Sequence, residues 1–551
     1  MAEFNYDLVV IGAGPGGYEA AFDAVKYGMK VAVIEKDRVG GTCLNRGCVP
    51  TKTIMRSSEL AKEAREGAKI GVNAADVKVD LDAVRARKDE VLDTLREGIE
   101  TGLAKAKIDL LHGLALVKDE HTVSYTDGEG ESHEVTGKFI LIATGGNPFI
   151  PPIPGAELEG VMDSTELLEQ GGTPFDDFVI IGGGVIGVEF ATVYNGFGSH
   201  VTVVEALDRL IPTVDKELAR SLKMSLQKDG IEVLTKCPVV RIEQADGRLA
   251  VVYTEKDEEK SIPADAVLMA VGRRSDVPSL LSEQLQHLAG ERGRLAVNEH
   301  YQSASPSIYG IGDAIGGIEL AHTATAEGRN AVAHMNGQEP PIRMATVPTC
   351  IYTVPEIASV GISADEAKEQ GIEIITKKYA MGANGKTVLE DLGRGTIKLI
   401  ADADSHILLG AQLMCVGDDK VADLLAIGRP TGGITHRVDA QPKPGRIEAQ
   451  EPEVLHEHDD TLGVGRRVRC PHPLDTHLME LAQTASLRAL STKHCLCVPK
   501  LNRSRALRDE LILHGGSDDT CRPLGAQRHA LLSLKTTFTP SANQPLHEST
   551  R

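Results

Sequence analysis

The sequence predicts an α/β fold with two Rossmann-like units, followed by a smaller α+β module that is incomplete at its end. Two G-x-G-x-x-G turns predict the paired units, because each follows a strongly apolar run. After residue 344 short β-branched runs replace the alternation of strand and helix, which predicts the module. We expect segments at 1–150, 151–275, 276–343 and 344–428, then an atypical segment at 429–551.

The first unit opens the chain. Residues 6–11 are typical of a buried parallel strand, and the turn at 12–17 leads into a helix from Tyr18. A second apolar strand, residues 31–34, ends at Glu35. Because strand, turn, helix, strand and acid occur in this order, the segment predicts a dinucleotide site rather than merely a tight turn.

At each of three positions in that turn there is a physical reason for glycine. Gly12 allows the tight turn, Gly14 lets the backbone approach a pyrophosphate, and Gly17 lets the helix pack closely on the strand. The carboxylate of Glu35 would then bind a ribose hydroxyl group.

The second unit repeats this order. An apolar strand at 178–181 precedes the glycines Gly182, Gly184 and Gly187, and a strand at 201–204 ends at Glu205. A carboxylate here binds a ribose 2′-hydroxyl and repels a 2′-phosphate, which favours NAD over NADP. No arginine occurs at 206–208 to reverse that preference.

After the second strand of the first unit, a glycine-rich turn leads to Cys43 and Cys48, which are separated by four residues. Pro50 has no N–H for the carbonyl of Arg46, so we expect the helix to be interrupted between the cysteines and the helix proper. A helix N-terminus also favours a thiolate. An isolated pair of this kind would more often be two structural thiols, but the neighbouring motifs favour a redox pair.

Composition limits the function further. The chain has 551 residues, a formal net charge of −20 and nine cysteines. The charge argues against nucleic acid or an anionic membrane as the main partner, and the cysteines are too few for a disulfide scaffold. The first residues enter a strand without a basic or long apolar leader, so we expect a cytoplasmic protein.

Two further strands end in residues suited to a cofactor. One, at 139–143, ends in Thr144 and Gly145, and the small glycine permits close passage of a ligand. The other, at 307–311, delivers Asp313 at its carboxyl end, where open α/β sheets bind ligands, although an ordinary helix cap is the alternative.

Together these motifs resemble the pyridine nucleotide-disulfide oxidoreductases over residues 1 to about 415, and within them the members that oxidise dihydrolipoyl groups. The resemblance is strongest in the run GGTCLNRGCVPTK, the paired glycine turns, and the segments 143–145, 311–313 and 354–358. It implies FAD in the first unit, with residues 276–343 completing that site, NAD in the second, and an association domain at 344–428.

The resemblance also implies roles for single residues. Cys43 would meet the substrate, Cys48 would lie against the flavin, Lys52 and Glu189 would form an ion pair near the flavin, and Asp313 would bind the ribityl chain. The implied cofactor-binding positions are Gly12, Gly14, Gly17, Glu35, Lys52, Ala115, Thr144, Gly145, Gly182, Gly184, Gly187, Glu189, Glu205, Gly272, Asp313, Ala321 and His322.

The reaction implied is transfer of two electrons from a dihydrolipoyl group to a Cys43–Cys48 disulfide, then to FAD and to NAD+. The partners would be the dihydrolipoyl groups of 2-oxo acid dehydrogenase or glycine cleavage complexes, together with a second copy of the chain. The alternatives are reduction of another disulfide or of mercuric ion, and flavin binding without lipoamide turnover.

After about Gly417 the chain departs from the family, whose catalytic base is a histidine in a His-Pro-Thr-x-x-Glu segment contributed across the dimer. His472 precedes Pro473 and is the nearest equivalent, but Leu474 and His477 replace the threonine and the glutamate. A solvated tail histidine is the other interpretation.

The departure has two explanations: a wrong reading frame after residues 415–429, or an extension that replaces the dimer element. We favour the first, because the substituted segment cannot bury a comparable apolar face. It predicts a disordered tail, without a metal site, that trypsin cleaves, and it leaves dimer formation in doubt.

Overall fold

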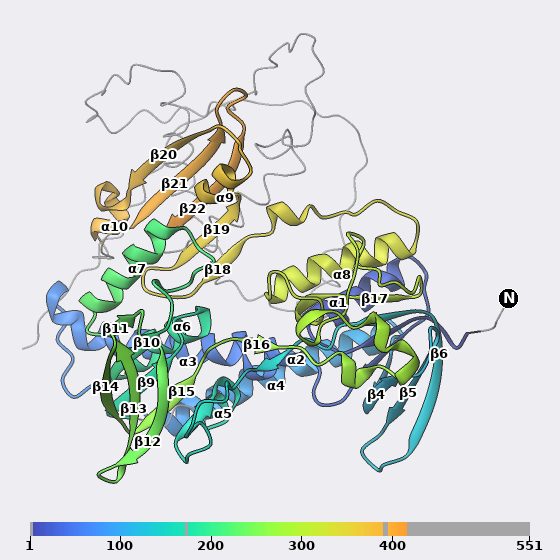
Figure 1. Cartoon of the computed structure of the whole chain (residues 1–551), viewed down its shortest axis with the longest axis horizontal. Helices are drawn as coiled ribbons and strands as arrows, with labels where there is room; N and C mark the ends of the chain where they lie inside the picture. Colours follow the sequence, from blue (N-terminus) through green and yellow to red (C-terminus); the bar gives the residue numbers. More distant parts are fainter. Residues whose placement is uncertain (1–3, 171–174, 390–394, 416–551) are drawn as a thin grey trace, which may run out of the picture. The chain divides into compact units, whose positions relative to one another are not determined.

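A computed structural model gives the fold and describes residues 4–170, 175–389 and 395–415. This part of the chain contains two sheets of mainly parallel strands accompanied by helices, a five-stranded antiparallel sheet and two smaller antiparallel sheets, which confirms the predicted class (Figure 1). None of its helices is long and apolar enough to cross a membrane. The atypical segment at 429–551, with His472, lies outside the described residues.

The first sheet has the order β3-β2-β1-β6-β5-β4, and β17 pairs with β6. Strands β1, β2, β3, β6 and β17 run parallel, whereas β4 and β5 extend the sheet in antiparallel fashion. Their bounds are β1 (Tyr6–Ile11), β2 (Val31–Glu35), β3 (Asp109–His112), β4 (Leu114–Val117), β5 (Thr122–Thr126), β6 (Ser132–Ile142) and β17 (Ile308–Gly310).

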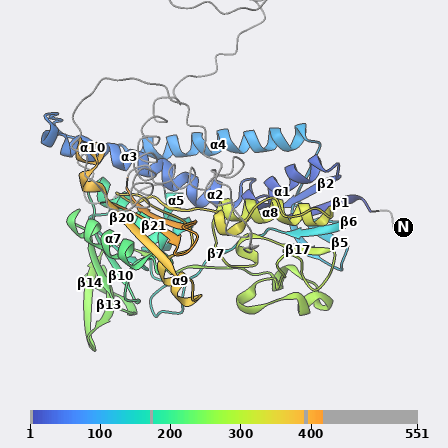
Figure 2. The same ribbon diagram turned by 90° about the horizontal axis from the view of Figure 1, so that it is seen from above.

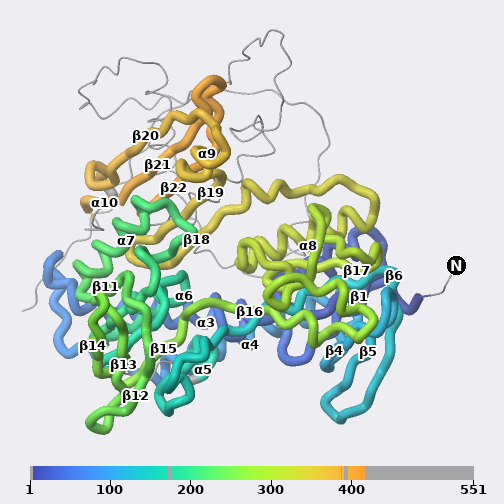
Figure 3. The backbone as a smooth tube through the Cα atoms, in the orientation of Figure 1, coloured from blue at the N-terminus to red at the C-terminus, as the bar shows by residue number. Residues whose placement is uncertain are grey.

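Two helices from distant parts of the sequence pack together beside this sheet. They are α1 (Pro15–Lys26) and α8 (Ala321–Met335), which lie side by side in Figure 3. Residues that follow the second unit therefore return to complete the first.

The second sheet is parallel throughout, in the order β11-β10-β9-β15-β8. Its strands are β8 (Val161–Asp163), β9 (Asp177–Ile181), β10 (His200–Glu205), β11 (Glu232–Thr235) and β15 (Ala266–Met269), with helices α5 (Ser164–Gln170), α6 (Val185–Phe197) and α7 (Lys216–Lys228). An antiparallel sheet of β12 (Val239–Ala245), β13 (Arg248–Glu255) and β14 (Glu258–Ala264) accompanies it. The linking segments pair through β7 (Asn147–Pro148) and β16 (Arg273–Arg274).

The helices that carry the cysteines are α2 (Gly41–Arg46) and α3 (Cys48–Glu66). Helix α3 continues through η1 (Gly67–Ile70) and packs against α4 (Leu81–Lys105) (Figure 2). Helix α3 also packs on α6 of the second unit, so one helix touches both units.

The third sheet has the order β18-β19-β22-β21-β20 and is antiparallel. Its elements are β18 (Thr349–Ile351), β19 (Ile357–Gly361), α9 (Ala364–Glu369), β20 (Ile374–Ala380), α10 (Gly385–Leu389), β21 (Thr396–Asp402) and β22 (Leu408–Met414). Ile351, Ile357 and Met414 are buried in the core of the second unit, so this module and that unit share packing.

The short 3₁₀ helices all fall between the larger elements. They are η2 (Pro278–Leu280), η3 (Glu283–Leu288), η4 (Glu291–Gly293), η5 (Gly312–Ala314), η6 (Met344–Thr346) and η7 (Met381–Ala383).

Candidate redox-active site

Residues of both glycine-rich turns and both cysteines line one cavity of about 2800 Å³. Among the described residues, it is lined by every predicted site residue except Gly17 and Gly187. The fold thus brings together positions that lie far apart in the sequence.

The two excepted glycines have a packing role. A Cβ atom on Gly17 would stand 1.9 Å from the carbonyl oxygen of Gly12, and one on Gly187 would stand 2.0 Å from that of Gly182. Each helix therefore approaches its strand more closely than any side chain permits, as the motif predicts.

The middle glycines face open space. A Cβ atom on Gly14 would meet only the Cα atom of Gly41, at 3.9 Å, and one on Gly184 would meet nothing within 4 Å. Both residues are helix N-caps without a side-chain hydrogen bond, so backbone N–H groups in the first turns of α1 and α6 are available to an anion, in α1 from Gly16 onward because Pro15 has no N–H. The geometry at both turns fits the pyrophosphate of a dinucleotide.

The two acids fix these turns. Oε2 of Glu35 accepts a hydrogen bond of 2.7 Å from the N–H of Ala13, and Oε2 of Glu205 accepts one of 2.6 Å from the N–H of Gly183. Burial raises the pKa of Glu35, although the N–H of Ala13 acts in the opposite direction. Both carboxylates line the cavity, where a ribose could share them.

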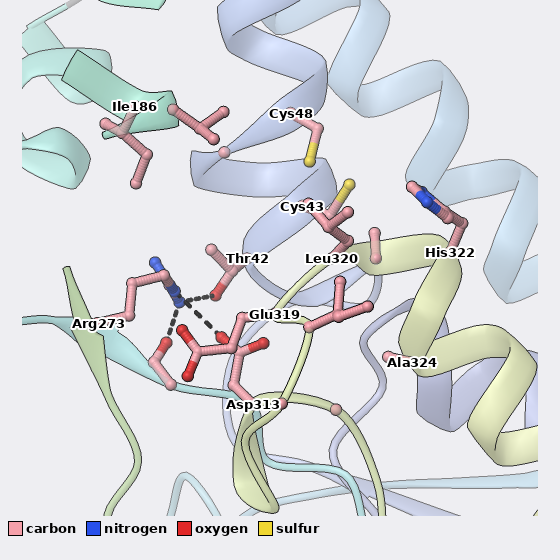
Figure 4. Close-up of a pocket in the computed structure, with 18 of the residues that line it drawn as sticks. Thr42, Cys43, Cys48, Ile186, Arg273, Asp313, Glu319, Leu320, His322 and Ala324 are labelled. Atoms are coloured by element: carbon pink, nitrogen blue, oxygen red, sulfur yellow. Dashed lines mark hydrogen bonds and ion pairs between the residues drawn. The ribbon is translucent and has the colours of Figure 1, made fainter. Parts of the chain in front are cut away.

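The cysteines lie on two different helices. Helix α2 ends at Arg46, Gly47 has a non-helical conformation (φ −149°, ψ −110°), and Cys48 begins α3. An interruption was predicted between the cysteines and the helix proper, but its position was wrong: the chain bends at Gly47, between the two cysteines, and both Cys48 and Pro50 belong to α3. The two sulfur atoms point toward each other (Figure 4).

The two thiols differ in acidity. A hydrogen bond from the Cys43 thiol to Cys48, together with burial, raises the pKa of Cys43. The same hydrogen bond and the charge of Lys52 lower the pKa of Cys48 to about 7, against the effect of burial. Cys48 is thus the thiol that ionises near neutral pH.

A partly buried ion pair stands beside Cys48. The ammonium nitrogen of Lys52 lies 2.7 Å from Oε2 of Glu189, whose side chain is 6% exposed. Oε1 of Glu189 accepts a 3.1 Å hydrogen bond from the N–H of Tyr352, and Lys52 lies 4.6 Å from the centre of the Tyr352 ring. Sequence analysis predicted the pair but not Tyr352, which no motif marks.

Asp313 has a partner that the sequence motifs did not identify. Its Oδ2 atom lies 3.1 Å from Nε of Arg273, which also hydrogen bonds to the hydroxyl group of Thr42 at 3.3 Å and to the carbonyl group of Gly146 (Figure 4). The sequence did hold a signal for this residue, because Arg273 directly follows the predicted Gly272; in the structure it begins the short strand β16.

Helix α8 contributes a third unpredicted residue, Glu327. Oε2 of Glu327 accepts a 2.7 Å hydrogen bond from the N–H of Gly312, next to Asp313. Burial raises the pKa of Glu327 to about 7, and the negative charge of Asp313 adds to this effect. Ala321 and His322 begin this helix, and Nε2 of His322 contacts the carbonyl oxygen of Pro348.

The fold and this site define a class of protein. Residues 6–328 match the family described as pyridine nucleotide-disulphide oxidoreductase, and residues 347–435 match its dimerisation domain. The chain belongs to this family of oxidoreductases, whose cofactors are FAD and NAD. The dimerisation match supports a homodimer, and it extends beyond the limit near residue 415 that the motifs indicated.

Curated relatives are dihydrolipoyl dehydrogenases. Those of Bacillus subtilis and Geobacillus stearothermophilus are 36% and 34% identical to the chain, over 80% and 81% of its length and 93% and 96% of theirs. Among solved structures, the HOCl-induced flavoprotein disulfide reductase RclA from Escherichia coli is 29% identical, with a TM-score of 0.67, covering 78% of this chain and 92% of that one. LpdA from Mycobacterium tuberculosis is 25% identical, with a TM-score of 0.70, over 76% and 92%.

Proposed function

We propose that the protein is a dihydrolipoyl dehydrogenase, which oxidises a dihydrolipoyl group and reduces NAD+. The observation that carries the proposal is the pairing of Cys43 and Cys48 in one cavity with both glycine-rich turns, joined to the names of the curated relatives. Its partners would be the lipoyl-bearing complexes of 2-oxo acid oxidation or glycine cleavage, and it would work as a homodimer.

In the oxidised protein Cys43 and Cys48 would form a disulfide. A substrate thiolate attacks the sulfur of Cys43, a mixed disulfide forms, and Cys48 leaves as a thiolate. The second substrate thiolate then attacks the substrate sulfur of the mixed disulfide, releases Cys43 and closes the lipoyl ring. A thiol of pKa about 7 is a better leaving group than an ordinary cysteine, and the Lys52 ammonium group favours its charge.

The cofactors would be held by residues already described. FAD, when bound, supplies the two-electron transfer that links a dithiol to a nicotinamide. Gly12, Gly14 and Glu35 would hold its adenosine and phosphates, and Asp313, positioned by Arg273, would hold its ribityl chain. Gly184 and Glu205 would hold NAD, because the carboxylate of Glu205 repels a 2′-phosphate.

The base that takes the substrate proton is the remaining role. We retain His472 as its candidate, although this residue lies outside the described part of the chain. Replacing it with glutamine should lower dihydrolipoamide oxidation by orders of magnitude if the assignment is right. Unchanged turnover would remove His472 from the mechanism.

The test is dihydrolipoamide-dependent reduction of NAD+ by the purified flavoprotein, with NADP+, glutathione and mercuric ion as competing assays. We expect turnover with NAD+ and dihydrolipoamide, and its loss in Cys43→Ser. Flavin binding without this turnover would reject the proposed reaction, and preference for another disulfide would favour a reductase of that disulfide.

A further inference from the structure

The side chain of Tyr352 connects the α+β module to the ion pair beside the cysteines. Tyr352 directly follows β18, and its ring packs against the buried core of the second unit. The ring centre is 4.6 Å from the ammonium nitrogen of Lys52, a distance at which an aromatic face attracts a cation. Lys52 therefore has an anion on one side and an aromatic ring on another.

The same residue also holds the anion. The backbone N–H of Tyr352 donates a 3.1 Å hydrogen bond to Oε1 of Glu189, while Oε2 of Glu189 binds Lys52. Glu189 is buried on α6, so its orientation is fixed by its surroundings. Three elements, α3, α6 and the end of β18, thus converge on one ammonium group.

The position of the Lys52 ammonium group affects how readily the Cys48 thiol ionises. Cys48 and Lys52 are four residues apart on α3, so their side chains share one face of the helix. The groups that act on Cys48 are Cys43 from α2, Lys52 from α3 and Glu189 from α6, with Lys52 favouring the thiolate and Glu189 opposing it. A displaced ammonium group would leave Glu189 as the nearer charge.

We propose that Tyr352 is a positioning residue for the redox centre: its ring holds the Lys52 ammonium group beside Cys48, and its N–H orients Glu189. The inference rests on the proposed function in treating the Cys48 thiolate as the reacting species. It adds that the α+β module takes part in setting the acidity of this thiol.

The test compares Tyr352→Leu, which removes the aromatic face, with Tyr352→Phe, which keeps it. In the reduced holoprotein, the long-wavelength absorption of a thiolate in contact with flavin is followed against pH. We expect Tyr352→Leu to raise the proton affinity of Cys48 roughly three- to tenfold, since cation–π contacts contribute on that scale. Tyr352→Phe should titrate as the unchanged protein does.

A double-mutant cycle distinguishes an effect of the Tyr352 ring through Lys52 from a general disturbance of the protein's structure. If the ring acts through Lys52, Tyr352→Leu should cause no further shift in a Lys52→Gln background. Should the leucine variant lose its flavin, Tyr352→Met fills the space without an aromatic face, and ultraviolet thiolate absorption reports the same titration.

Three results would overturn the inference: an unshifted Tyr352→Leu titration, an equal shift in Tyr352→Phe, or an undiminished shift in the Lys52→Gln background. Absence of lipoamide turnover in every variant would instead reject the proposed function. The titration does not depend on turnover, so the two failures are distinguishable.

Discussion

The ammonium nitrogen of Lys398 lies 2.7 Å from Oδ2 of Asp215, and the two side chains are 9% and 4% exposed. Lys398 belongs to β21 of the α+β module, whereas Asp215 caps the N-terminus of α7 in the second unit. Burial alone lowers the pKa of Lys398, but hydrogen bonds to Asp215 and Glu217 reverse this and raise it. The pair therefore joins the two parts through charges held away from water.

Removing this lysine should destabilise the protein. In Lys398→Met the carboxylate of Asp215 stays buried without its cation, which costs about 3–5 kcal/mol for a buried pair. The measurement is the Tm of the holoprotein. Lys378→Met is the matched control, because Lys378 binds the same Glu217 but is 50% exposed, and we expect a change of at most about 1 kcal/mol. Equal effects of the two substitutions would contradict the prediction.

Loss of Arg273 should weaken flavin binding. Arg273→Ala leaves the partly buried carboxylate of Asp313 and the carbonyl group of Gly146 without their donor. An unsatisfied group of this kind costs roughly 1–3 kcal/mol, about five- to 150-fold in affinity if the cost falls on the bound state. Equilibrium titration of the stripped protein with FAD measures it. The neighbouring Arg274→Ala, outside this contact, should bind FAD as the unchanged protein does.

Glu327 should make the protein less stable as pH rises. Its pKa in the folded state is about 7, above the ordinary value of 4.5, so the folded state holds a proton that the unfolded state has released. Between these two values stability falls with increasing pH, and it levels off above about 7.

Glu327→Gln provides the measurement for this effect. The amide oxygen can still accept from Gly312, but the side chain no longer titrates. We expect equal Tm values near pH 4.5 and a more stable variant at pH 8, by roughly 1–3 kcal/mol. A variant that is less stable at pH 8 than the unchanged protein would show that the carboxylate is charged and stabilising.

Glu189→Gln should lower the pKa of Cys48, whereas loss of the Lys52 charge should raise it. Glu189 raises the pKa of Cys48 and Lys52 lowers it. Neutralising the carboxylate removes the opposing charge, so the thiolate should persist to lower pH than about 7. The thiolate–flavin absorption of the reduced holoprotein measures both variants, and a shift of the same sign in Glu189→Gln and Lys52→Gln would refute the electrostatic account.

Much of the fold could be predicted because its signals are local. The strands before Gly12 and Gly182 are continuous apolar runs, and a G-x-G-x-x-G turn between strand and helix has one common structural meaning. The cysteine pair, Lys52, Glu189 and Asp313 were found through motifs of contiguous residues or through the family resemblance. The structure places all of them around one cavity.

The residues that were missed act across long sequence separations. Arg273 contacts Thr42, Glu327 contacts the turn before Asp313, and Tyr352 contacts Glu189 from another sheet. Such contacts depend on tertiary packing and leave no periodic pattern in the sequence. A helix break was predicted near the cysteines, but it was placed after both of them and assigned to Pro50, since proline is the more familiar cause of such a break; the break is instead at Gly47.

The pairing of β17 with β6 also bears on how the protein is made. Ile308, Tyr309 and Gly310 complete a sheet whose other strands end by residue 142, so the whole second unit must leave the ribosome before the first can close. A nascent chain halted before that point would expose the unpaired edge of β6. Such an edge can pair with other chains, which leads to aggregation, and it is bound by chaperones. Gene fragments that stop near residue 150 should therefore yield insoluble product, however complete their nucleotide-binding motif.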